Sequence, residues 1–178
     1  MNPEMMEDEE VSEPGKFIVL LRHGIAEDRS DAKKDEDRSL TSEGHARMKQ
    51  IARGLERIFP KAQAIYSSPL LRAVQTSLWV SKGYRSRIKV NTSDFVRPGT
   101  SGKEFVVFLQ SLPERRVIIV GHEPALTEHF IRLIGLKNPD RIELKKGGCY
   151  GLRLRASGSA SVEWLLSPKV LRKLAGTE

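Results

Sequence analysis

The sequence from residue 17 to residue 24 reads Phe17-Ile18-Val19-Leu20-Leu21-Arg22-His23-Gly24. Five apolar residues in succession, with no polar residue between them, are typical of a strand that is covered on both faces. In open α/β sheets, ligands bind in the crevice beyond the carboxyl ends of the parallel strands. Arg22 and His23 follow the apolar run directly and are therefore expected in such a crevice, where Gly24 would let a ligand approach the backbone.

Two other apolar runs are also followed by polar side chains. Residues 62–67 lead into Ser68 and Arg72, and residues 117–120 lead into His122. Because the carboxyl ends of parallel strands meet at one edge of a sheet, these side chains are expected to lie near the first arginine and histidine. A lone histidine at a strand end is more often structural, so the prediction of a site depends on this convergence.

Segments of helical periodicity separate the apolar runs. Thr41 is the predicted N-cap of the first helix, which Pro60 must end. Ser68 is the predicted N-cap of the second helix, with Pro69 in its first helical position. Two more helices are predicted over residues 102–112 and from Pro124 to the glycine at position 135.

The alternation of strands and helices predicts an α/β fold with three layers, α/β/α, around a mainly parallel sheet. At the carboxyl end the pattern changes, because residues 150–155 and 162–166 are joined by a short turn and must pair antiparallel. They are predicted to form a hairpin at one edge of a mixed sheet, followed by a helix over residues 168–174. We expect a single domain over residues 16–178.

The charge is distributed unevenly along the chain. Residues 1–13 hold six acidic residues and no basic one, which leaves 17 acidic residues against 30 basic ones in the remainder. Residues 1–15 are therefore predicted to be a disordered acidic tail. The basic remainder favours an anionic partner, which could be nucleic acid, an acidic protein surface or a phosphorylated substrate. Nucleic acid is disfavoured, because the aromatic content is 6% and no known nucleic-acid-binding motif is present.

Cys149 is the only cysteine, so the chain can form neither an internal disulfide nor a cysteine-based metal site. The amino terminus lacks the apolar core of a signal peptide, and no apolar run is long enough to cross a bilayer. We expect a monomeric cytoplasmic protein that does not bind membranes.

The polar groups at the three strand ends share one chemical property, which is affinity for an anion. They comprise two guanidinium groups, two imidazoles and two helix N-termini, without a carboxylate in these short motifs. Guanidinium groups and free backbone N–H groups at helix N-termini bind phosphoryl dianions. A divalent cation would be repelled by the arginines, so we predict no metal and no cofactor. The residues expected at this phosphate site are Arg22, His23, Gly24, Ser68, Arg72 and His122.

Four motifs carry a resemblance to a known family. In chain order they are Leu21-Arg22-His23-Gly24, Leu40-Thr41-Ser42-Glu43-Gly44, Ser68-Pro69-Leu70-Leu71-Arg72-Ala73-Val74-Gln75-Thr76 and Gly121-His122. On the basis of these motifs, the chain resembles the histidine phosphatase superfamily over residues 16–166. This superfamily is also described as phosphoglycerate mutase-like. Within it the chain is most similar to the short SixA-like phosphohistidine phosphatases, because it lacks long insertions and opens its helix with Gly121-His122-Glu123-Pro124.

The resemblance implies a function for each matching residue. His23 would be the nucleophile that is transiently phosphorylated, and Arg22, Arg72 and His122 would surround the phosphate. The implied activity is the hydrolysis of phosphohistidine in a protein, without a cofactor. Two alternatives remain, a small-molecule phosphatase of the same superfamily and an inactive module that binds phosphate or phosphohistidine.

The chain departs from the larger members of the family in its general acid. Those members present a glutamate from an inserted region that this chain lacks. Asp94 lies in the corresponding part and is our candidate general acid, with a solvated loop residue or a helix cap as its alternative role. An imidazole leaving group, with a pKa near 6.5, needs an acid less than an alkoxide does, which favours phosphohistidine as the substrate.

Overall fold

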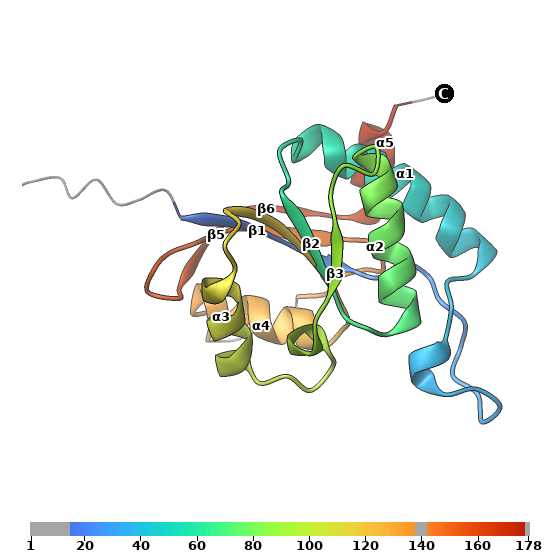
Figure 1. Ribbon diagram of the computed structural model, residues 1–178, viewed down its shortest axis with the longest axis horizontal. Helices are drawn as coiled ribbons and strands as arrows, with labels where there is room; N and C mark the ends of the chain where they lie inside the picture. The colour runs from blue at the N-terminus through green and yellow to red at the C-terminus, as the bar shows by residue number, and fades with distance from the viewer. Residues whose placement is uncertain (1–14, 138–141, 177–178) are drawn as a thin grey trace, which may run out of the picture.

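The computed structural model describes residues 15–137 and 142–176, so almost all of the predicted acidic tail lies outside the described residues. Within them, one six-stranded sheet has the strand order β3-β2-β4-β1-β5-β6 (Figure 1). The strands β1 to β4 are mutually parallel where they pair, and β5 and β6 are antiparallel, as predicted. The strands are β1 (Lys16–Arg22), β2 (Ala64–Ser67), β3 (Val90–Thr92), β4 (Arg116–Gly121), β5 (Cys149–Leu154) and β6 (Ala160–Leu166).

Helices cover both faces of this sheet, which confirms the predicted three-layer α/β architecture. Figure 1 shows α1, α2 and α5 on one face and α3 and α4 on the other. The helices are α1 (Ser42–Ile58), α2 (Leu71–Gly83), α3 (Gly102–Ser111), α4 (Ala125–Ile134) and α5 (Pro168–Leu174), and two short 3-10 turns are η1 (Asp35–Asp37) and η2 (Asp94–Val96). No helix in the described part of the chain is both long enough and apolar enough to cross a membrane.

The central strand β1 contributes to two cores at once. Val19 and Leu21 pack toward α1, α2 and α5, whereas Ile18 and Leu20 pack toward α3 and α4. All four side chains are fully buried. Successive side chains of a strand point to opposite faces, so an uninterrupted apolar run is what a strand with two covered faces requires.

Of two helix N-caps predicted from the sequence, the structure confirms the first and contradicts the second. The Thr41 hydroxyl accepts a hydrogen bond from the Gly44 N–H at 3.0 Å, which confirms it as the N-cap of α1. The prediction of Ser68 as the N-cap of α2 was wrong, because that helix begins at Leu71 after Leu70. The Ser68 hydroxyl instead accepts from the Leu70 N–H at 3.3 Å, a local turn that competes with helix capping.

The short helix α5 is joined to α1 by very close backbone packing. A Cβ atom on Gly54 would lie 1.9 Å from the carbonyl oxygen of Leu171, which is far inside van der Waals contact. Leu171 is fully buried and belongs to the same core as Leu55 of α1. The glycine is therefore required by helix packing, in spite of the low helix propensity of this residue.

We expect Gly54→Ala to lower the free energy of unfolding by about 1–3 kcal/mol, because the added methyl group must push a backbone carbonyl aside. Helix propensity alone predicts the opposite sign, a gain of about 0.5–1 kcal/mol. Urea denaturation followed by circular dichroism measures the difference in the free energy of unfolding between the variant and the wild type. Gln50→Ala on the exposed side of the same helix is the control and should change the value by no more than about 0.5 kcal/mol. A stabilised Gly54→Ala variant would contradict the packing described.

Candidate active site

Two histidines lie side by side at the carboxyl ends of β1 and β4. The ring centroids of His23 and His122 are 5.1 Å apart, with the ring planes inclined by 54°. The strands are in parallel register, with Arg22 opposite Gly121, and the His23 N–H donates to the Gly121 carbonyl at 3.0 Å. His23 is 7% exposed and His122 is 3% exposed, so both imidazoles are largely removed from water.

The orientation of the His23 ring is set by a hydrogen bond within its own segment. Its Nδ1 atom lies 2.7 Å from the Gly24 carbonyl oxygen. A carbonyl can only accept, so Nδ1 carries the proton of the neutral ring and Nε2 keeps its lone pair. This tautomer leaves a nucleophilic nitrogen at the end of the ring that is remote from the backbone.

Both imidazoles are neutral at pH 7. Burial lowers the pKa of His23 to about 3, against the Gly24 hydrogen bond, which raises it. The positive charges of Arg72, Arg22 and Lys146 lower the pKa of His23 further. Burial also lowers the pKa of His122 to about 3, and the neighbouring His23 and the positive charge of Arg72 lower it further.

Arg72 lies in the first turn of α2 and is 4% exposed. Its guanidinium donates from Nη1 to the Asp35 carbonyl at 2.6 Å and from Nη2 to the Asp35 carboxylate at 3.0 Å. A guanidinium has five N–H donors, so the two bonds described leave its remaining donors for another acceptor. The Nε atom of Arg72 is buried and has no partner among the described residues.

Arg22 is anchored in a similar way at the end of β1. Its Nη1 donates to the Leu144 carbonyl at 2.6 Å, and its buried Nε has no partner in the described part of the chain. Both ring nitrogens of His122 are likewise buried without a hydrogen bond there. Buried polar atoms are normally satisfied, so this cluster of unpaired nitrogens indicates a place where a polar ligand completes the bonding.

Gly24 and Ser68, which we predicted to bind substrate, have structural contacts. A Cβ atom on Gly24 would lie 2.7 Å from Met48 Cγ, so the glycine makes room for the core. Its N–H donates to the Thr76 hydroxyl at 3.0 Å, and that hydroxyl donates to the Arg72 carbonyl at 2.7 Å. Thr76 thus connects the segment after β1 to the helix that carries Arg72.

The structure does not bring Asp94 into contact with the histidines. Its side chain is 83% exposed and forms an ion pair with Arg97 at 2.7 Å. Its role as a general acid stays a prediction, and the contacts described here are those of a solvated loop residue.

Three charged residues near the site were missed in the sequence. Asp35, in the charged loop over residues 27–38, pairs with Arg38 at 2.7 Å as well as with Arg72, and these contacts hold its pKa below the ordinary range. The positive charge of Lys146 lowers the pKa of His23. Glu123 lies within the Gly121-His122-Glu123-Pro124 motif, and burial raises the pKa of its carboxyl group.

Glu123 has a defined hydrogen-bond partner. Its carboxylate accepts from the Thr127 hydroxyl at 2.9 Å, and that hydroxyl lies 3.0 Å from the Tyr150 hydroxyl. The only sequence signal for Glu123 was its position beside His122. Among the described residues, no group of three or more His, Cys, Asp or Glu side chains is arranged to hold a metal ion.

The chain is similar to two solved structures of the same fold. The protein histidine phosphatase SixA in complex with tungstate has a TM-score of 0.78 and 22% identity, and the match covers 87% of this chain and 99% of that one. A mutant phosphoserine phosphatase from Entamoeba histolytica in complex with phosphoserine has a TM-score of 0.68 and 17% identity, over 87% of this chain and 98% of that one. At such identities the likeness concerns the fold alone.

Sequence comparison extends the likeness beyond the fold. An uncharacterized protein of Picosynechococcus sp. (strain ATCC 27264 / PCC 7002 / PR-6) is 32% identical over 149 residues, which are 82% of this chain and 88% of the relative. The family model of the histidine phosphatase superfamily (branch 1) matches residues 18–94, the segment that contains Arg22, His23 and Arg72. The chain therefore belongs to the histidine phosphatase superfamily (branch 1).

Proposed function

We propose that this protein is a phosphatase that hydrolyses phosphohistidine in a protein, with His23 as its nucleophile. The observation that carries the proposal is the neutral His23 ring, whose Nδ1 is held by Gly24. Beside it lie the buried Arg72, the half-buried Arg22 and the buried His122, each with a buried nitrogen that has no partner among the described residues. A neutral imidazole is a competent nucleophile, and the cations supply the electrostatic stabilisation that phosphoryl transfer requires.

The reaction proceeds in two displacements at phosphorus. In the first, the Nε2 lone pair of His23 forms a bond to phosphorus while the bond from phosphorus to the leaving nitrogen breaks. In the second, a water oxygen forms a bond to phosphorus while the bond from phosphorus to Nε2 of His23 breaks. The electron pair returns to Nε2, and inorganic phosphate leaves with the protons of the water. Arg22 and Arg72 donate to the equatorial oxygens, and His122 contributes the N–H of its neutral ring.

The leaving group supports phosphohistidine as the substrate. An imidazole leaves readily without a strong acid, and no carboxylic acid hydrogen-bonds to His23 in the described part of the chain. The solved structure with the higher TM-score is itself a protein histidine phosphatase. Phosphohistidine hydrolysis thus fits both the chemistry of the site and the resemblance.

A small-molecule phosphatase is the second candidate, and one observation favours it. The same fold occurs in a phosphoserine phosphatase. A comparison of kcat/KM for a phosphohistidine protein, a phosphohistidine peptide, phosphoserine, nucleotides and sugar phosphates tests the two functions. The phosphohistidine protein should be preferred, and a higher kcat/KM for phosphoserine or a sugar phosphate would reject our proposal.

His23→Ala should reduce phosphatase activity by at least about 10³-fold, because it removes the nucleophile. His45→Gln is the matched control, because glutamine keeps an acceptor for the Trp79 indole that now donates to His45 at 2.9 Å. The control should stay within about twofold of the wild type. A rapid quench with labelled substrate should trap an acid-labile, base-stable phosphoenzyme on His23. Binding of phosphate without any turnover by the wild type would instead support an inactive binding module.

Arg72→Ala should lower kcat by about 10² or more, since it removes charge-assisted donors to the transferring phosphoryl group. Arg29→Ala is the control, because Arg29 contacts the same Asp35 at 3.1 Å but is 81% exposed. We expect less than about a threefold change for that variant in steady-state assays with p-nitrophenyl phosphate. Equal losses of kcat in the two variants would contradict the assignment of Arg72 to the phosphate site.

The His23 and His122 imidazoles should not titrate between pH 5 and pH 8 in a phosphate-free buffer, because burial lowers the pKa of each to about 3. In the unfolded chain they take up protons below about pH 6.5, so their contribution to stability is complete above that pH and declines as the pH falls toward 3. NMR of 13C-labelled histidines measures the titration, with the His23 signal assigned by its loss in His23→Ala. A midpoint near 6.5 for His23 would contradict the expected neutral ring.

A further inference from the structure

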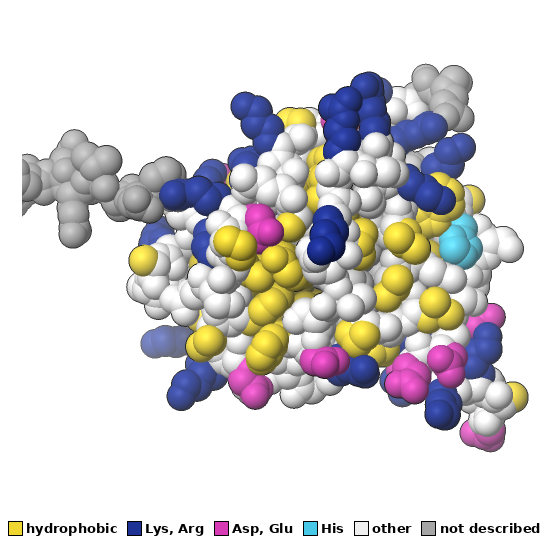
Figure 2. Space-filling view, viewed as in Figure 1, with side chains coloured by type: hydrophobic (Ala, Val, Ile, Leu, Met, Phe, Trp, Pro, Cys, Tyr) yellow, Lys and Arg dark blue, Asp and Glu magenta, His cyan; other side chains and the backbone are white. Residues whose placement is uncertain are grey.

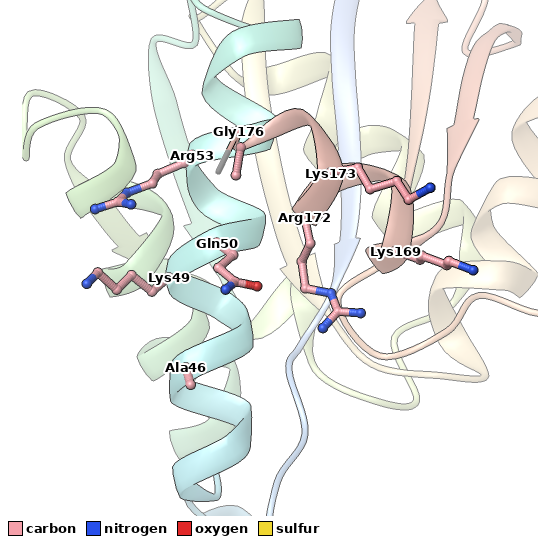
Figure 3. A pocket seen from close by; sticks show the side chains of 9 residues that line it. Ala46, Lys49, Gln50, Arg53, Lys169, Arg172, Lys173 and Gly176 are labelled. Atoms are coloured by element: carbon pink, nitrogen blue, oxygen red, sulfur yellow. The ribbon is translucent and has the colours of Figure 1, made fainter. Parts of the chain in front are cut away.

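A basic groove lies between α1 and α5, outside the phosphate site. Its volume is about 710 Å³, and its lining contains five cationic residues and no Asp or Glu among the described residues. Figure 3 shows Gln50 and Arg172 directed between the two helices, whereas Lys49 and Arg53 extend from α1 away from α5, and Lys169 and Lys173 extend from α5 away from α1, so that these four cations flank the groove. We call this surface the basic groove.

Positive side chains also predominate on the side of the molecule that carries the groove. In Figure 2, Lys and Arg side chains crowd the upper margin of the molecule, where α1, α2 and α5 lie in Figure 1, and most of the visible Asp and Glu side chains lie along the lower margin. Within the groove, the Nε of Arg172 is buried and has no hydrogen-bond partner among the described residues. A buried, unpaired guanidinium nitrogen at the centre of a cationic surface indicates that an anionic group binds there.

The loop of Lys146 and Gly147 contacts both the end of β1 and the two helices that form the groove. A Cβ atom on Gly147 would lie 2.6 Å from Ile51 Cδ1 of α1 and 3.7 Å from Pro168 Cβ of α5. The same Gly147 donates its N–H to the Arg22 carbonyl at 3.1 Å. The loop that carries Lys146 therefore contacts the end of β1 and, through Ile51 and Pro168, the sequence neighbours of the groove residues Gln50 and Lys169.

The lining of the groove distinguishes between two kinds of polyanion. It contains no aromatic residue on which a nucleic-acid base could stack. The remaining lining residues are small or neutral, namely Ala46, Gln50, Ala175 and Gly176. Such a surface can accept the carboxylates of an extended or helical acidic segment through separate ion pairs.

We infer that the basic groove is the docking surface for an acidic segment of the phosphorylated protein whose phosphoryl group enters the site of His23. This inference rests on the proposed function, because it assumes that the substrate is a protein. Docking would raise the rate of encounter and lower KM for the protein substrate, without affecting the chemistry of a small phosphoester.

The test compares two triple variants that change the charge equally. Lys49→Glu/Lys169→Glu/Lys173→Glu reverses three exposed lysines of the groove, whereas Lys61→Glu/Arg87→Glu/Lys89→Glu reverses three exposed cations next to the amino ends of β2 and β3. The substrates are an acidic protein phosphorylated on histidine with phosphoramidate and p-nitrophenyl phosphate.

We expect the groove variant to raise KM for the phosphoprotein at least about fivefold at low salt and the control variant less than about twofold. The difference in KM between the two variants should shrink when added salt shortens the Debye length below about 8 Å. For p-nitrophenyl phosphate, KM should stay within about twofold in both. Equal KM values for the phosphoprotein in the two variants would overturn the inference.

A binding measurement separates this inference from the proposed function. Fluorescence anisotropy of a labelled oligoglutamate peptide and a labelled oligothymidylate of equal length reports binding without any turnover. The inference predicts that the peptide binds and that only the groove variant weakens it, even if the wild type proves inactive on phosphohistidine. If the wild type binds the oligothymidylate more tightly than the peptide, and the groove variant loses that binding, the inference is overturned in favour of nucleic acid as the ligand of the groove.

Discussion

The parallel pairing of β1 with β4 is the constraint on which the candidate active site depends. Neighbouring strands lie about 4.8 Å apart, and the two imidazoles that follow these strands have centroids 5.1 Å apart. The sheet thus sets the separation of His23 and His122 directly, without a flexible loop between strand and ring. A slip of one residue would turn the buried side chains of β1 to the wrong faces, so the register that places the histidines is also the one that packs both cores.

The site concentrates positive charge, and the fold limits the electrostatic repulsion that this causes. The imidazoles remain neutral because burial lowers their pKa values, so the positive charge that acts on them comes from Arg22, Arg72 and Lys146. The carboxylate and carbonyl of Asp35 hold one face of the Arg72 guanidinium, and the Leu144 carbonyl holds Arg22. Each arginine is fixed by part of its donors and keeps an Nε that has no partner among the residues the structure describes, which is the arrangement of a site prepared for an anion.

The loop around Gly147 gives the proposed docking surface its physical connection to that site. It contacts the backbone of Arg22, the side chain of Ile51 in α1 and Pro168 at the start of α5. The close contact of Gly54 with Leu171 keeps α5 against α1, and the groove exists only because these two helices lie together. The loop therefore connects the backbone at the end of β1 with the two helices that carry the cations of the groove.

The sequence by itself determined the layers of the fold and most of the site, because those features follow from local signals. The apolar run of β1, the Thr41 cap and the short turn of the C-terminal hairpin specify their elements within a few residues, and the strand ends then bring His23, Arg72 and His122 together. Only the tertiary structure decided the contact of Asp35 with Arg72, the position of Lys146, the exposure of Asp94 and the groove between α1 and α5. These depend on packing between segments far apart in the chain, such as the 37 residues that separate Asp35 from Arg72, and no periodicity or capping signal reports such contacts.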